Sequence, residues 1–163
     1  MASLKELIFN KGGIGKSLSR QETVERINPL IREHIALNHQ HDYVIRTIGD
    51  AEIAERLEQF QKIARVDVGK LAEVVFSAGG TAYSGVDMEP DDFNLGTDPA
   101  EMIHRLLEAE RRFLQLVNDE LKLNHQIRTK AVLNLVRQHS EERLRYLQEV
   151  ARRYPKPATL ATS

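Results

Sequence analysis

The sequence predicts an all-α protein, a four-helix bundle of two antiparallel hairpins joined by a long crossover loop. Four long stretches carry apolar residues at the three- and four-residue spacing of a helix. Only a few residues separate the first stretch from the second and the third from the fourth, so each pair should fold as a hairpin. Residues 79–97 lie between the hairpins. They could reach about 60 Å when extended, which exceeds the roughly 40 Å length of each helix.

The composition is typical of a soluble protein and excludes several kinds of site. At 163 residues the chain can build one domain with a real core. The 23 Lys and Arg against 24 Asp and Glu leave no basic excess, so we expect neither nucleic acid nor an anionic membrane as a partner. The absence of Cys excludes disulfides, thiolate metal ligands and Cys nucleophiles. No apolar run resembles a membrane span or a secretory signal, so we expect a cytoplasmic protein.

Three segments are predicted along the chain: a flexible N-terminal arm over residues 1–18, the bundle over 19–154, and a disordered tail over 155–163. The arm contains apolar residues that could dock on the domain or on a neighbour, namely Leu4, Leu7, Ile8 and Phe9. The tail begins with prolines at 155 and 157, which cannot continue a helix.

The first helix is predicted over residues 20–48. Ser19 and Glu22 have the spacing of a capping box, in which each side chain bonds the backbone N–H of the other. Pro29 removes one helical hydrogen bond, so the helix could instead begin near Asn28.

The second helix is predicted over residues 51–78. Gly49 ends the first helix, and Asp50 provides an N-cap for the second. Gly79 and Gly80 stop the second helix and begin the crossover. Loops of this length are uncommon in compact domains and usually have a function.

The third helix is predicted over residues 98–123. Asp98 is a good N-cap, Pro99 suits the first helical position, and Glu101 would complete a capping box. An apolar stripe follows at helical spacing: Ile103, Leu106, Leu107, Phe113, Leu114, Val117 and Leu121.

The fourth helix is predicted over residues 126–153, after a left-handed Asn124. One side of this helix carries Ala131, Leu135, His139, Glu142, Tyr146 and Val150, and Leu133, Val136, Leu144 and Leu147 lie beside them.

Glu110 lies within the apolar stripe of the third helix, where a carboxylate is costly unless it is paired, hydrogen-bonded or bound to a metal. The other three helices also bring ionisable groups to the middle level of the bundle: Glu33 and His34, Arg65 and Asp67, and His139 and Glu142. Imidazole and carboxylate together are typical ligands of iron, manganese or zinc.

The chain order, the helix lengths and the position of the crossover resemble the ferritin-like superfamily over about 130 residues. That resemblance implies a di-iron site, with one Glu from each of two helices and Glu-x-x-His from each of the other two. The second helix offers no Glu-x-x-His, and the fourth has His and Glu in the reversed order. The resemblance therefore implies a non-standard site for iron, or for Mn or Zn, in which ferroxidase-type activity stays open. Its candidate ligands are Glu33, His34, Glu110, His139 and Glu142.

The same residues allow a structural alternative. Glu110 could pair with an arginine or with His139, or could face a dimer interface. His34 and His41 could be satisfied core or interface histidines. The protein would then be a metal-free ferritin-like bundle that acts as an oligomeric interaction or scaffold protein. Long helices with wide apolar stripes favour a homodimer or a larger homo-oligomer.

Two resemblances concern the Gly-rich end of the arm. Residues 11–17 resemble the phosphate loop of the nitrogenase iron protein and ParA-type ATPases, which implies nucleotide binding through Lys16. Such a loop belongs to a βαβ unit, and no strand is predicted downstream, so a flexible linker is the favoured interpretation. Residues 13–18 resemble the tags, usually C-terminal, that direct ferritin-like cargo into encapsulin shells, which implies such a shell as an alternative partner.

Overall fold

The computed structural model describes residues 16–160, and within them it shows four long helices and no strand. The long helices are α2 Arg20–Thr47, α3 Ala51–Ser77, α4 Pro99–Leu121 and α5 Ile127–Arg153. Two short 3-10 helices, η1 Pro90–Phe93 and η2 Ala158–Leu160, complete the described secondary structure. The predicted all-α fold is confirmed, and every predicted helix boundary agrees with the observed one to within two residues.

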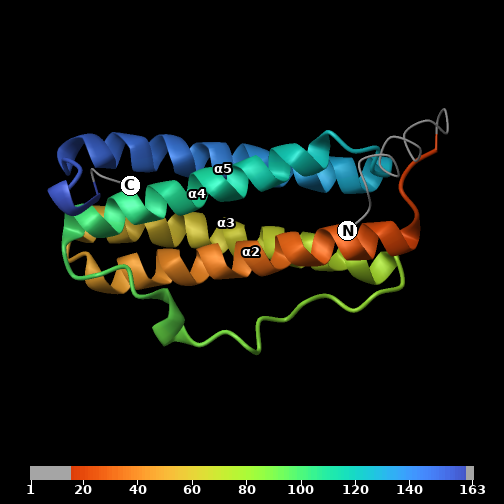
Figure 1. The fold of residues 1–163 in the computed structure, drawn as a ribbon, viewed down its shortest axis with the longest axis horizontal. Helices are drawn as coiled ribbons and strands as arrows, with labels where there is room; N and C mark the ends of the chain where they lie inside the picture. The colour runs from red at the N-terminus through yellow and green to blue at the C-terminus, as the bar shows by residue number, and fades with distance from the viewer. Residues whose placement is uncertain (1–15, 161–163) are drawn as a thin grey trace.

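The four helices pack as a bundle in which every neighbouring pair is antiparallel (Figure 1). Helix α2 packs against α3 and α4, and helix α5 packs against α3 and α4. The segment between α3 and α4 passes along α2 from one end of the bundle to the other (Figure 1). All four helix midpoints therefore lie at about the same level.

The crossover is attached to α2 by side chains near both of its ends. The Asn28 amide donates to the Thr81 carbonyl (2.9 Å) and accepts from the Tyr83 N–H (2.8 Å). At the other end, the Tyr43 hydroxyl donates to the Gly96 carbonyl at 2.5 Å. These bonds hold the loop against the bundle.

The predicted N-caps form as expected. Ser19 and Glu22 make the reciprocal capping box, with both bonds at 3.1 Å. Asp50 accepts from the backbone of Ile53, and Asp98 begins α4 by accepting from the third helical N–H, each at 3.2 Å. Local capping chemistry thus sets where three of the helices begin.

The structure corrects one expected cap and decides between the two expected starts of α2. Glu101 does not return to the cap of α4, because its carboxylate pairs with Arg105 one turn later at 2.6 Å. Pro29 lies inside α2, which continues through it. Its side chain is exposed, so the ring does not disturb the packing of the core.

Residues 16–18 lie against the turn between α4 and α5. The Asn124 amide donates to the Lys16 carbonyl (2.5 Å), and the Leu18 N–H donates to the Asn124 carbonyl (2.8 Å). The expected left-handed Asn124 is wrong, since every described residue with positive φ is a glycine. Most of the predicted arm, including its apolar residues, lies outside the described residues.

The core is apolar along the bundle, with a layer of polar side chains across its middle. Buried Ile, Leu, Val, Phe and Met side chains fill the space above and below this layer. None of the described helices is both long enough and apolar enough to cross a membrane. The polar layer is the feature of the core that hydrophobic burial does not explain.

Candidate functional site

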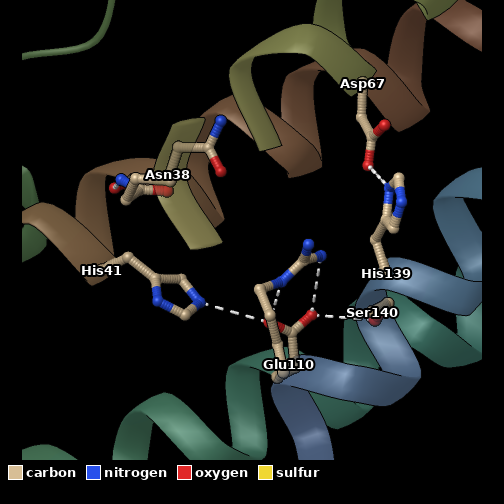
Figure 2. A network of polar contacts seen from close by, with 8 residues as sticks. Asn38, His41, Asp67, Glu110, His139 and Ser140 are labelled. Carbon is tan, nitrogen blue, oxygen red and sulfur yellow. Dashed lines mark hydrogen bonds and ion pairs between the residues drawn. The ribbon is translucent and has the colours of Figure 1, made fainter. Parts of the chain in front are cut away.

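Glu110 is the centre of the polar layer, and its carboxylate is fully buried. Arg143 binds it in a bidentate manner, with Nε 2.6 Å from Oε1 and Nη2 3.2 Å from Oε2. The Ser140 hydroxyl donates to Oε2 at 2.8 Å, and His41 Nε2 lies 3.2 Å from Oε1. Figure 2 shows the Glu110 carboxylate between His41 on one side and Ser140 on the other. The cluster therefore joins α2, α4 and α5.

The protonation states in this cluster follow from its hydrogen bonds. Burial alone would raise the pKa of Glu110, but the charge of Arg143 and the hydrogen bonds from His41 and Arg143 outweigh burial and lower that pKa to about 2. An ionised carboxylate only accepts hydrogen bonds, so His41 must carry its hydrogen on Nε2. The Glu110 charge is neutralised by the guanidinium inside the same chain.

Sequence reasoning missed Arg143, although a signal for it exists. The buried positions of α5 recur at alternating three- and four-residue steps: Leu133, Val136, Ser140, Arg143, Leu147 and Val150. The prediction included Leu133, Val136 and Leu147 near the inward side, but at the middle level it chose His139 and Glu142, each one residue before the observed inward position. With the correct rotation, an arginine one turn after a serine would have faced Glu110.

His139 has a different partner from the one the metal hypothesis requires. Its Nδ1 lies 2.7 Å from Asp67 Oδ2, and the Asp67 side chain is almost fully buried. In Figure 2, His139 is turned toward Asp67 and away from Glu110. This pair joins α3 to α5 and is separate from the Glu110 cluster.

His34 is fully buried, and neither of its ring nitrogens has a hydrogen-bond partner among the described residues. Its ring packs against Phe113 with the centroids 4.6 Å apart. Burial and the positive charge of Arg143 lower the pKa of His34 to about 3, so the ring is neutral near neutral pH.

Glu33 and Glu142 do not reach the polar layer, because both lie on the exposed surface of their helices. Each is one residue from an inward position, and adjacent helical residues point about 100° apart. Residues 16–160 hold no group of three or more His, Asp or Glu side chains arranged to bind a metal ion. The five expected ligands are therefore not brought together, and the residues at the centre do not fit a di-metal site.

A second ionic cluster lies farther along α4. The Glu120 carboxylate accepts from Arg26 (Nη2 to Oε2, 2.8 Å) and from His125 Nε2 at 3.0 Å. Burial raises the pKa of Glu120, but the hydrogen bonds from His125 and Arg26 outweigh it and lower that pKa. Here too, one carboxylate of α4 is held by one arginine and one histidine.

The Gly-rich resemblance falls mostly on residues outside the described range. Lys16 is exposed. A phosphate loop connects a strand to a helix, and residues 16–160 contain no strand. The described structure thus provides no βαβ unit for this loop.

The comparisons with known proteins identify no family for this chain. The sequence matches no known protein family, and it has no significant match among curated proteins.

Proposed function

We propose that this protein is a ferritin-like four-helix bundle without a metal centre, and that it acts as an interaction or scaffold protein. The observation that carries the proposal is the bidentate bond from the Arg143 guanidinium to the buried Glu110 carboxylate. A metal ion at this position would need the same carboxylate oxygens. It would also lie beside a fixed positive charge in a region of low dielectric, where repulsion is strong.

The topology supports the ferritin-like assignment. The antiparallel neighbours and the crossover along the bundle are the arrangement expected for two hairpins joined in this way (Figure 1). In a metal-binding member of this class the carboxylates of the core neutralise cations. Here the Glu110 carboxylate is neutralised by the Arg143 guanidinium instead of a metal cation, and Ser140 and His41 complete its hydrogen bonds.

The surface is where such a protein would act. Four hollows in the part of the chain that the structure describes are lined by the outer faces of helices and by the C-terminal segment, and neither Glu110 nor His34 lines any of the four. The buried Glu110 charge is already paired with Arg143, so the outer helix faces are the surfaces that we expect to bind a partner.

Metal analysis tests the proposal. Protein purified without chelator should contain less than one equivalent of iron, manganese or zinc. Its melting temperature should not rise when Fe(II), Mn(II) or Zn(II) is added, since only a ligand that binds the folded state stabilises it. Exposed Glu33→Gln and Glu142→Gln variants should give the same results as the native chain.

One equivalent of metal that is lost in Glu110→Gln would overturn the proposal and favour the metal-binding alternative. If that variant does not fold, a metal-dependent rise in the melting temperature of the native chain has the same meaning. Faster loss of Fe(II) in air with the native chain than with Glu110→Gln would add ferroxidase activity to that alternative.

A further inference from the structure

We infer that the groove between α2 and α4 is the contact surface for a second copy of this chain, arranged antiparallel about a two-fold axis. This inference rests on the proposed function, because it names the partner of an interaction protein. Three adjoining hollows lie along the contact between α2 and α4. The end hollows each share two lining residues with the middle one: Gln40 and Arg112 on one side, and Glu33 and Leu116 on the other.

The two ends of this α2–α4 groove carry opposite charges. The end near the C-terminus of the chain is lined by four cationic side chains and one carboxylate: Arg105, Arg111, Arg112, Lys156 and Glu108. The other end is lined by four carboxylates and one cation: Glu25, Glu33, Asp119, Glu120 and Arg26. The middle is mainly apolar, with Ala36, Leu37, Ala109, Phe113 and Leu116.

This order of charges is self-complementary. In a two-fold interface the same patch meets itself in the reverse direction, so the cationic end of each copy faces the acidic end of the other. Arg105 and Asp119 lie about 21 Å apart along α4, and Arg112 is midway between them. A two-fold axis at the level of Arg112 would place Arg105 of each copy at the level of Asp119 of the other. Both residues also have an ion pair at the surface of their own chain, Arg105 with Glu101 and Asp119 with Lys122.

Two unpaired charges support the same arrangement. Glu33 and Arg112 both line the middle of the groove from opposite helices. Neither has an ion pair or hydrogen bond within the described residues. In the two-fold arrangement, Arg112 of each copy lies near Glu33 of the other, which would neutralise both.

The α2–α4 face has about the size of a dimer interface. Three of the apolar residues that line its middle, Leu37, Ala109 and Phe113, are already buried within the chain. Helix α4 is about 34 Å long, and two adjacent helices are about 20 Å wide, which gives a face of about 700 Å². Stable interfaces bury about 800 Å² per partner. Leu116 is 40% exposed, and a second copy would cover it.

Sedimentation velocity of the full chain tests this inference. The native protein should sediment as a dimer of about 37 kDa, twice its mass of 18.6 kDa. Arg112→Glu and Glu33→Arg should each raise the dimer dissociation constant about tenfold or more, because like charges then meet across the axis. The double variant should restore the dimer. Arg145→Glu reverses an exposed charge outside the groove and should have no effect.

A monomeric native protein would overturn the inference, and so would a dimer that these variants do not weaken or that the double variant does not restore. A monomer whose residues 1–15 resist proteolysis would indicate that the arm occupies the groove instead. Circular dichroism shows whether each variant keeps its helices. None of these outcomes depends on metal content, so failure of the dimer and failure of the metal-free proposal can be told apart.

Discussion

Helix α4 carries two carboxylates, Glu110 and Glu120, that are bound by the same kinds of partner in different surroundings. Each accepts from one arginine and one histidine. The Glu110 and Arg143 side chains are 0% and 1% exposed, whereas those of Glu120 and Arg26 are 9% and 39% exposed. The two clusters share their kinds of partner and differ in burial. We therefore expect burial to decide how strongly the fold depends on each cluster.

The physical reason for this expectation is that water has different access to the two clusters. Around Glu120, water can still reach the arginine and would solvate either charge if its partner were removed. Glu110 and Arg143 are both closed off from bulk solvent, so each charge needs the other. A buried pair of this kind contributes little net stability compared with a well-packed apolar core, yet losing one member is severe.

The largest expected effect comes from breaking the central pair. Glu110→Gln or Arg143→Met should each lower the free energy of unfolding by about 3–5 kcal/mol, because each leaves an uncompensated buried charge. Urea unfolding followed by circular dichroism measures this. The double variant Glu110→Leu/Arg143→Met should recover most of the loss, since it removes both charges. A double variant whose loss equals the sum of the two single losses would show that the two side chains are not coupled, and that an uncompensated buried charge is not the cause of the single losses.

The next largest expected effect is the loss of folding stability at low pH that the buried His34 should cause. His34 has a folded pKa of about 3 against an ordinary value of 6.5. As the pH falls through this window the unfolded chain takes up a proton that the folded chain does not, so stability must fall with pH. The slope should approach about 1.4 kcal/mol per pH unit.

His34→Leu should flatten the stability profile between pH 6.5 and about 4.5 relative to the native chain. Below that range the profile of the variant should still fall, because the pKa of Glu110 is lowered from 4.5 to about 2 and its stabilisation is lost as the carboxylate is protonated. Urea midpoints across this pH range measure both parts. Equal slopes for the variant and the native chain above pH 4.5 would contradict this account of His34.

The same contrast explains how much could be predicted from the sequence. Helix boundaries followed from local signals such as the Ser19 capping box, Asp50 and Gly49, which act within a few residues. Glu110 could also be recognised as unusual from local sequence, because it interrupts the apolar stripe of a single helix.

The partner of Glu110 was not identified, because it depends on the rotation of α5 about its own axis. A change of one residue in the assumed inward side exchanges Ser140 and Arg143 for His139 and Glu142. Apolar residues lie on both sides of α5, so the sequence pattern alone is compatible with either rotation. The packing of α5 against α4 selects one rotation, and the sequence of a single helix does not show how that helix packs.

A smaller effect is expected from breaking the peripheral pair. Arg26→Met or Glu120→Gln should each cost about 1 kcal/mol or less, because Arg26 is substantially exposed. These two variants are matched controls for the central variants. Both carboxylates lie on α4, both accept from an arginine and a histidine, and the substitutions are the same. A loss as large as that of Arg143→Met, measured by the same urea unfolding, would mean that burial does not explain the difference between the clusters.

The smallest effect is the response of each pair to salt. Added salt screens charges that water can reach and acts much less on buried ones. The coupling energy between Arg26 and Glu120, taken from a double-mutant cycle, should therefore fall by a few tenths of a kcal/mol at high ionic strength. The coupling between Arg143 and Glu110 should stay constant in the same experiment. If both coupling energies fell together, water would have to reach the centre of the bundle, and Glu110 would then be open to a metal ion as well.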